Sequence, residues 1–475
     1  MTQKRLDPAT TYDKTDAESI LRHASKLTGN TLNSLIGSGE MVIGGTNNKG
    51  LFGQIVEEGY FLIENNSSPL PDFQDAGIEL KVAPMKKTSK GLVSKERLIL
   101  GLINYDDVPK KHFGIFLDKD SHILMVFYLW QKNKDIRDYR FLKVVDWRPS
   151  PDELRIFRED WEVIEGYIMR GEAHLLSERH TRYLAACTKG IGHGRDMRSQ
   201  PFSMEPAKQR ALSFKASFMT ELYRSHADIG EILVDDANDD TASILQGGWP
   251  PEETFEEHIV RRLDRFVGRT CREIEEELGV DLSSRSKQYY YMLVLSMFGV
   301  TKKKRIKEFV EAGITIKTVR TTLTGRPKES TSFPAFRSEE LVMQSWEDSD
   351  LFNQIDREFF IPVFQFRTKH PEKEGRKDLV FKGAFFWYVP DDDMEIIKGV
   401  WEDTKQKILE ERFDDFVKIS DRRIAHVRPH GRNSKDLDTF RGTKFVKKGF
   451  WLNNAYMMEV IRSHLRNRRI VRVVR

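Results

Sequence analysis

The sequence predicts an α/β protein, in which a mixed sheet is flanked by helices and the whole arrangement is repeated in tandem. Short apolar segments typical of strands alternate with longer segments whose apolar residues follow the helical period. Several segments also recur in the same order, between 236 and 240 residues apart. The length of 475 residues leaves room for two domains of roughly 220–240 residues each.

The first half is predicted to run from helices through a sheet to further helices. Apolar residues at helical spacing predict helices over Glu18–Leu35 and Gly50–Ile63. Ile78–Pro84 alternates as a strand does, and Ile123–Tyr128 is a continuous apolar run suited to a buried strand. A long amphipathic helix is predicted over Asp152–Arg170.

The second half repeats features of the first. Phe255–Leu278 has helical spacing, as the start of the first half has. Three pairs of segments match in order: GIELKV at Gly77–Val82 with GITIKT at Gly313–Thr318, REDWEVIEGYI at Arg158–Ile168 with KGVWEDTKQKI at Lys398–Ile408, and FKASFMTELY at Phe214–Tyr223 with WLNNAYMMEVI at Trp451–Ile461. A nearly constant offset indicates a duplicated domain.

Charge and turn-forming residues mark the predicted boundary between the two copies. From Ala227 to Glu257 there are ten acidic residues and no Lys or Arg, and Gly-Gly-Trp-Pro-Pro follows the acidic pairs. We therefore expect a first domain at 1–232, an acidic linker at 233–253 and a second domain at 254–475. The net charge is only +4, but the last fourteen residues carry six arginines, which favours contact with a polyanion.

Composition excludes several classes of protein. No apolar run is long enough to span a bilayer, and the polar N-terminus has no signal-peptide core, so we expect a cytoplasmic protein without membrane partners. The two cysteines, Cys187 and Cys271, have neither metal-ligand spacing nor the number needed for a disulfide framework. The scattered histidines, His112, His122 and His193 among them, are interpreted as surface or loop residues.

The segment from Pro71 to Val82 carries the strongest chemical signal. On a strand, Glu79 and Lys81 point to one side while Leu80 points to the core. The turn at Asp75–Gly77 lets Asp72 fold back towards them. Two carboxylates and a backbone carbonyl, that of Leu80, form a hard oxygen site that suits Mg²⁺.

That arrangement suits hydrolysis of a phosphodiester. The reaction needs a positioned water, a metal and positive charge for the transition state. Asp72 and Glu79 would hold the metal, and Lys81 would orient or help deprotonate the nucleophile. The alternative is a surface strand on which Glu and Lys form an ordinary ion pair.

The context of these residues resembles the MutH family of GATC-directed DNA endonucleases. Asn48–Glu57 reads NKGLFGQIVE and is followed by Asp72, Glu79-Leu80-Lys81 and Pro84, as the KGxxGxxxE helix and D-x6-E-L-K strand are in that family. Arg158–Glu162 is similar to its REDWE helix. Across the chain, SKERL at 94–98, LINY at 102–105 and YLAACTKG at 183–190 resemble the staphylococcal Sau-type restriction endonucleases, which have two MutH-like domains.

The resemblance implies a fold of two tandem restriction-endonuclease-like domains and a set of site residues. It implies that Glu57, Asp72, Glu79, Lys81 and Lys119 form the active site, with Glu57 near the metal. It also places Lys49 and Gly50 near the DNA backbone.

The second half departs from this pattern. Glu308, Thr315 and Lys317 stand where the first half has Asp72, Glu79 and Lys81, while Leu295 replaces the helix glutamate and Lys382 is taken to match Lys119. Thr315 and Leu295 each stand where the first half has a carboxylate. The loss of these two carboxylates predicts an inactive copy kept for DNA binding.

Candidate DNA-reading residues follow from the same resemblance. Arg428-Pro429-His430 stands where the family has an R-P-K loop against bases, and arginine suits guanine in the major groove. The first half keeps Thr188 and Lys189 there. Ser213 replaces a tyrosine near the adenine methyl group, with Trp451 in the second half, which leads to the hypothesis of cutting that tolerates adenine methylation.

The sequence therefore predicts a type II restriction endonuclease that hydrolyses double-stranded DNA at GATC with Mg²⁺ and leaves 5′-phosphate ends. Its second domain would bind DNA as an effector, and two chains would meet on a site unless one chain nicks twice. A cognate DNA methyltransferase would act on the same site. The alternatives are a strand-nicking repair endonuclease and a non-catalytic DNA-binding protein.

Overall fold

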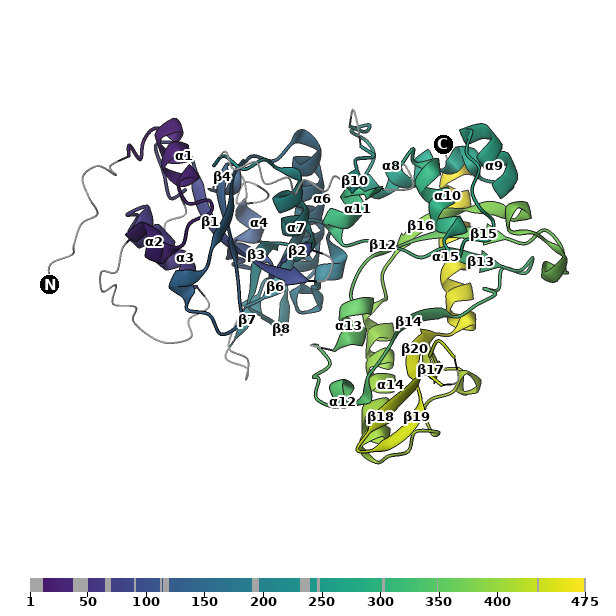
Figure 1. Cartoon of the computed structure of the whole chain (residues 1–475). Coiled ribbons are helices and arrows are strands. Elements are labelled where there is room, and N and C mark those ends of the chain that lie inside the picture. Colours follow the sequence, from purple (N-terminus) through teal and green to yellow (C-terminus); the bar gives the residue numbers. More distant parts are fainter. Residues whose placement is uncertain are drawn as a thin grey trace. The chain divides into compact units, whose positions relative to one another are not determined.

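The computed structural model describes residues 12–36, 50–64, 70–88, 91–111, 113, 119–189, 196–230, 240–245, 248–300, 304–347, 349–433 and 435–473. The chain forms two compact units (Figure 1). Unit 1 comprises Met1–Ser243 together with Lys307–Gly313, and unit 2 comprises Ile244–Ile306 and Ile314–Arg475.

Unit 1 contains a four-stranded mixed sheet in the order β2-β1-β4-β5 and a three-stranded antiparallel sheet in the order β3-β9-β6. A separate hairpin is formed by β7 and β8. The strands are β1 (Glu79–Thr88), β2 (Gly91–Ser94), β3 (Leu98–Leu102), β4 (Ile123–Leu129), β5 (Phe141–Trp147), β6 (Leu184–Thr188), β7 (Met197–Gln200), β8 (Ser203–Lys208), β9 (Arg210–Phe214) and β10 (Thr241–Ala242). The parallel pairing of β1 with the fully apolar β4 places the site strand next to the centre of the sheet.

Helices flank these sheets. They are α1 (Ala17–Ser25), α2 (Leu32–Ile36), α3 (Leu51–Ile55), α4 (Val108–Lys111), α6 (Pro151–Met169), α7 (Ala216–Ser225) and, from later in the chain, α11 (Lys307–Ala312). Helix α6 begins at a capping box between Ser150 and Glu153, with Pro151 in the first turn, and buries Trp161 in the middle of its apolar face. A π-helical turn, η2 (Val56–Tyr60), continues α3.

Unit 2 has the same pattern of sheets. Strands β12 and β13 both pair in parallel with β15, β16 pairs antiparallel with β15, and a second sheet has the order β14-β20-β17. The strands are β11 (Arg305–Ile306), β12 (Thr315–Ile316), β13 (Val319–Thr321), β14 (Thr331–Ala335), β15 (Phe359–Gln365), β16 (Val380–Trp387), β17 (Ala425–Pro429), β18 (Leu437–Phe440), β19 (Thr443–Val446) and β20 (Lys448–Leu452). The matching order supports the predicted duplication.

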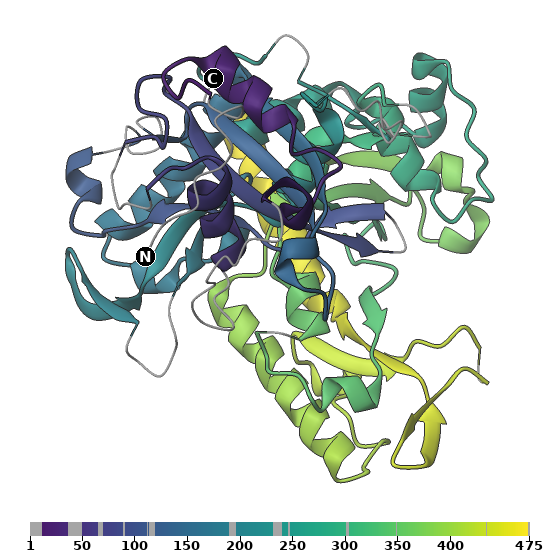
Figure 2. The same cartoon turned by 60° about the vertical axis from the view of Figure 1, so that its left-hand side comes forward.

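The helices of unit 2 cover its two sheets. They are α8 (Phe255–Arg262), α9 (Cys271–Leu278), α10 (Tyr289–Met297), α12 (Ser338–Leu341), α13 (Asp350–Ile355), α14 (Asp391–Leu409) and α15 (Asn454–Val473). Helix α14 lies beside the strands of the three-stranded sheet in both views (Figures 1 and 2).

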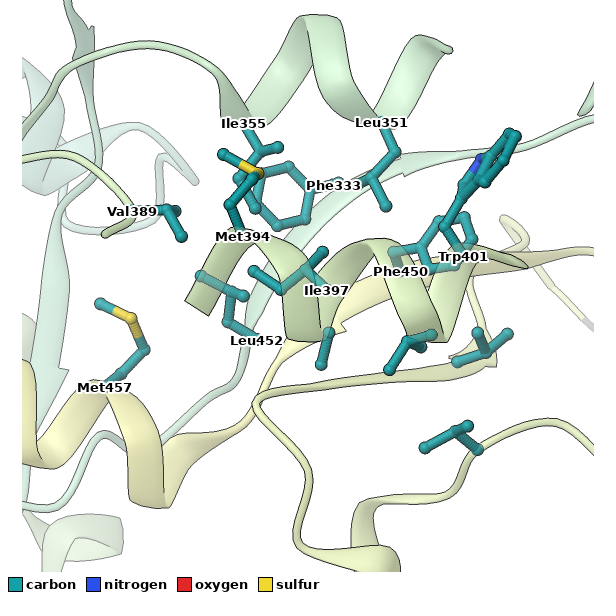
Figure 3. Packing of buried hydrophobic residues seen from close by; sticks show 14 of the residues in the cluster. Phe333, Leu351, Ile355, Val389, Met394, Ile397, Trp401, Phe450, Leu452 and Met457 are labelled. Atoms are coloured by element: carbon teal, nitrogen blue, oxygen red, sulfur yellow. The ribbon is translucent and has the colours of Figure 1, made fainter. Parts of the chain in front are cut away.

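A large apolar core holds unit 2 together. Trp401 of α14 packs with Phe333 of β14, Phe450 of β20 and Leu351 of α13 in one cluster (Figure 3). Trp401 is the eleventh residue of its helix, as Trp161 is of α6, and both side chains are buried. The repeated tryptophans therefore mark the same core position in the two copies.

Two predicted helices are each divided in the structure. Glu18–Leu35 forms α1 and α2, because Gly29 turns the chain at φ +81° and its N–H bonds to Phe141 O. Phe255–Leu278 forms α8 and α9, because Gly268 adopts φ +90° and Thr270 caps the second helix.

Part of the predicted linker belongs to the folded structure of unit 2. Residues 233–239, 246 and 247 lie outside the described residues, but Ile244, Leu245 and Trp249 are buried, and Trp249 Nε1 donates to Glu253 O. These apolar side chains make 244–253 part of unit 2. Within the described residues, no helix is long and apolar enough to cross a membrane.

Candidate active site

The site begins with strand β1, which presents Glu79 and Lys81 on one side. Ile78 and Leu80, on the other side, are buried in the core of unit 1. Glu79 pairs with Ile123 of β4 in register, and its N–H donates to His122 O over 3.0 Å. The alternation of side chains predicted for the strand is confirmed.

A tight turn before β1 brings Asp72 back to Glu79. Phe73 and Ile78 bond to each other through both backbone N–H groups, and Gly77 adopts φ +66°, which a side chain would strain. The Asp72 N–H then donates to Glu79 Oε2 over 3.1 Å, and the Leu80 N–H donates to Asp72 Oδ2 over 3.0 Å. The two carboxylates are thus held together by reciprocal bonds to backbone.

Two lysines reach the same carboxylate. Lys81 Nζ lies 2.5 Å from Glu79 Oε1, and Lys119 Nζ lies 3.3 Å from the same atom. Lys119 and Asp120 are helical and lie just before β4. Burial opposes the charge on Lys81, but Glu79, Asp120 and Asp72 outweigh burial and raise the pKa of Lys81. Lys81 therefore stays protonated.

Glu57 approaches from the π-helical turn η2, a local irregularity that is frequent at functional sites. Burial, followed by the charge of Asp72, raises the pKa of Glu57. Burial and the charge of Glu79 likewise raise the pKa of Asp72. The structure thus brings all five predicted active-site residues of unit 1 into one charged group.

Sequence reasoning missed one member of this group, Asp120. Its side chain is buried, and burial raises its pKa to about 7, with Lys81 acting in the opposite direction. Among the described residues no hydrogen-bond partner reaches its Oδ1. Its position directly after Lys119 was the available signal.

The carboxylates of this group determine whether Mg²⁺ fits the site. Within the part of the chain that the structure describes, no three His, Cys, Asp or Glu side chains are close enough together to hold a metal. Mg²⁺ does not require three, because it binds through one or two carboxylates and keeps water and phosphate as its other ligands. The tethered pair of Asp72 and Glu79 fits that requirement.

The predicted DNA-contacting residues of unit 1 divide into three groups. Gly50 is exposed at the start of α3, and Thr188 and Lys189 are exposed at the end of β6. Lys49 lies outside the described residues. Ser213 is fully buried in β9, where its Oγ donates to Ala185 O over 3.2 Å.

The prediction that Ser213 contacts DNA is therefore wrong for this structure. All five residues of β9 are buried, so the strand belongs to the core and presents no side chain to a ligand. The hypothesis of tolerance to adenine methylation rests on the absence of the tyrosine ring at this position and stays a prediction.

In unit 2 the register identifies the counterparts of the site. Thr315 pairs with Phe359 as Glu79 pairs with Ile123, so Thr315 and Lys317 stand where Glu79 and Lys81 do. Leu295 is buried in α10. Glu308 lies on α11 within unit 1, where Ser243 Oγ donates to it over 2.5 Å.

The match of Lys382 to Lys119 is corrected. Lys382 lies on β16, the strand that pairs antiparallel with β15, whereas Lys119 precedes β4. Counting back from Phe359 in the same way places Ile355, the last residue of α13, at the position of Lys119. Unit 2 thus has an apolar residue in place of that lysine.

The predicted reading loop of unit 2 lies at the end of β17. Pro429 is exposed, while Arg428 and His430 are half-buried around Trp451. The Arg428 guanidinium lies 3.8 Å from the centre of the Trp451 ring, and His430 meets the ring edge to face. Arg428 pairs with Gly449 as Cys187 pairs with Ala211, so the two loops occupy equivalent places.

A mixed sheet with a carboxylate and a lysine on one strand and a second carboxylate in the turn before it, repeated in tandem with the second set incomplete, defines a restriction-endonuclease-like protein. The model of the DNA mismatch repair enzyme MutH matches residues 61–160 and 299–399. The type II restriction enzyme Sau3AI of Staphylococcus aureus is 31% identical over 457 residues, covering 86% of this chain and 91% of that protein.

MutH mismatch repair proteins match over about one unit. The protein of Vibrio campbellii is 23% identical over 46% of this chain and 97% of its own length, and that of Shewanella amazonensis is 28% identical over 35% and 75%. The chain belongs to the family of type II restriction enzymes built from MutH domains. This confirms the predicted fold of two tandem MutH-like domains and the predicted enzyme class, a site-specific endonuclease.

Proposed function

We propose that the chain hydrolyses double-stranded DNA at GATC sites with Mg²⁺, that it leaves 5′-phosphate ends, and that unit 1 carries out the reaction. The observation that carries the proposal is the group around Glu79. Lys81 and Lys119 through their side chains, and Asp72 through its N–H, all contact the Glu79 carboxylate, and the corresponding position in unit 2 is Thr315. The target sequence rests on the likeness to Sau-type enzymes.

In this mechanism the carboxylates of Asp72 and Glu79 would hold the metal, with the Leu80 carbonyl and Glu57 as further candidate ligands. When bound, Mg²⁺ would supply Lewis-acid chemistry, neutralising charge on the scissile phosphate and activating water. Lys81 is held in place by Glu79 and remains protonated, so it orients the nucleophile and stabilises the negative charge of the transition state. Lys119 adds a second positive charge at the same oxygen of Glu79.

Unit 2 would bind DNA without cutting it and act as an effector. The exposed Pro429 and the half-buried Arg428 and His430 provide a loop equivalent to Thr188 and Lys189 in unit 1. Because each chain has one complete catalytic group, cutting both strands requires two chains on one site or two successive nicks. The host's own DNA would need protection by a methyltransferase of the same site in the same compartment, the cytoplasm.

The test is plasmid digestion in Mg²⁺ by the wild type and by Glu79→Ala, followed by sequencing of the fragment ends. Discrete ends at GATC that disappear in Glu79→Ala are the expected result. Asp75→Ala is the matched control, because Asp75 is an exposed carboxylate in the same turn. A wild type that retains binding in a gel shift but never cuts would instead support a non-catalytic DNA-binding protein.

A further inference from the structure

The vestigial site of unit 2 has become cationic. In unit 1, the Glu79 carboxylate contacts two lysines, Lys81 and Lys119. In unit 2 that position is Thr315, and the Arg357 guanidinium lies beside it, with Nη1 3.5 Å from Thr315 Oγ1. Arg357 follows α13 in the loop before β15, two residues after the position that corresponds to Lys119.

Lys317 adds a second positive charge to the same place. Its Nζ donates to Ser332 O over 3.0 Å and lies 5.3 Å from the centre of the Phe333 ring. Burial and the charge of Arg357 lower the pKa of Lys317, whereas neighbouring carboxylates raise that of its counterpart Lys81. The same lysine position therefore has opposite electrostatic surroundings in the two units.

Both cations keep donors for a ligand. Arg357 Nη2 donates to Asn353 O and Nη1 to Thr315 Oγ1, so among the described residues each of these two-proton groups keeps a second N–H. Lys317 donates one of its three protons to Ser332 O. Both side chains are partly exposed, so an anion can reach them.

The positions that would bind a metal do not fit one in unit 2. Leu295 and Thr315 have no carboxylate, and Glu308 is hydrogen-bonded to Ser243 within unit 1. Fixed guanidinium and ammonium groups can instead bind a phosphate directly.

We propose that Lys317 and Arg357 form a metal-independent binding site for a backbone phosphate of duplex DNA, at the place where unit 1 would hold a metal and a scissile phosphate. The inference deepens the proposed function and rests on its assignment of DNA binding to unit 2. Unit 2 would bind DNA in the absence of Mg²⁺. The carboxylates of unit 1, in contrast, would repel a phosphate until a metal ion neutralises their charge.

The experiment measures binding of the full-length chain to a fluorescent GATC duplex by anisotropy in EDTA, at a series of salt concentrations. Lys317→Met and Arg357→Met are each expected to weaken binding about tenfold and to lower the slope of log affinity against log salt by about one. Lys405→Met is the matched control. It also removes a half-buried lysine of unit 2, but one that bonds to Gln344 O from helix α14.

A further variant tests the same site in the opposite direction. Thr315→Glu is expected to weaken binding in EDTA as the lysine variant does, because it places a negative charge beside the Arg357 guanidinium. Ca²⁺, which binds carboxylates, should restore that binding. Arg357→Lys keeps the charge and should retain most of the affinity.

Wild-type affinity and salt slope in EDTA for a folded Lys317→Met chain would overturn the proposal, while leaving Mg²⁺-dependent cleavage intact. If Lys317→Met fails to fold by circular dichroism, unchanged binding of Thr315→Glu in EDTA overturns it instead. A wild type that binds DNA in EDTA but never cleaves it in Mg²⁺ would contradict the nuclease assignment alone.

Discussion

Strands β1 and β12 occupy the same place in two copies of one fold, yet the charged side chains around Glu79 and around Thr315 differ. In β1, Glu79 collects Lys81 and Lys119, and Asp72 is tied to it through the backbone. In β12, Thr315 has Arg357 beside it, and Lys317 lies against Phe333. Under the proposed function, a threonine in place of Glu79 removes a metal ligand and also leaves Lys317 and Arg357 without a carboxylate at that position.

The strand backbone differs as well. β1 is continuous over ten residues, whereas the equivalent stretch of unit 2 is two short strands, β12 and β13, with Lys317 between them. Lys317 N–H still donates to Phe360 O over 2.9 Å, so the lysine keeps its place against β15. The pairing of this stretch with β15 has therefore been preserved, although the side chains at the site differ.

Replacing Lys81 or Lys317 by methionine should give the largest difference between the two sites. Lys81→Met is expected to slow plasmid cleavage about a thousandfold, because it removes positive charge next to the reacting phosphate. Lys317→Met should only raise the enzyme concentration needed for half-maximal cleavage. Rates measured under single-turnover conditions at saturating enzyme separate the two, and a thousandfold loss for Lys317→Met would place catalysis in unit 2 also.

The paired tryptophans test whether the two copies are stabilised alike. Trp161→Ala and Trp401→Ala should each lower the free energy of unfolding of their own unit by about 3 kcal/mol, since both rings are buried in an apolar core. Urea unfolding followed by circular dichroism would show a different transition shifted in each variant. A single transition shifted equally by both changes would mean that the units unfold together.

A substitution of Glu57 tests whether this residue belongs to the site of unit 1. Glu57→Gln is expected to reduce the cleavage rate about tenfold to hundredfold, since its carboxylate shares the electrostatic field of Asp72 and Lys81. Its neighbour Glu58 is exposed and bonds to Gln54, so Glu58→Gln should leave the rate within about twofold. Equal rates for the two variants would remove Glu57 from the site.

The smallest expected effect concerns α11, the helix of the second half that belongs to unit 1. Glu311 accepts a hydrogen bond from the Tyr183 hydroxyl over 2.6 Å, and burial raises its pKa to about 8 from 4.5. Between these values the folded chain binds more protons than the unfolded chain. The free energy of unfolding therefore falls as pH rises, by at most about 1.4 kcal/mol per pH unit.

Glu311→Gln should flatten that part of the pH dependence, because the amide does not titrate. Urea unfolding of unit 1 at several values between about pH 5 and pH 8 measures the slope. An unchanged slope would show that Glu311 does not titrate in this range.

Local patterns predicted the catalytic strand well. The alternation along Ile78–Pro84 and the turn before it were sufficient to place Asp72, Glu79 and Lys81 together, because these residues are only a few positions apart in the chain. The tandem fold could be predicted for a similar reason, because segments of similar sequence form similar local structure. Glu57 and Lys119 required the resemblance to MutH, because spacing alone does not link them to β1.

Contacts between residues distant in the sequence were decided only by the tertiary structure. Burial of Ser213 depends on how β9 is enclosed between β3 and β6, and no property of the serine itself reveals it. Asp120 enters the site only because β4 lies beside β1. Arg357 reaches Thr315 from 42 positions away. Sequence by itself thus determined the elements and the site strand, whose interactions are short-range, while packing of the sheets decided which other charges meet there.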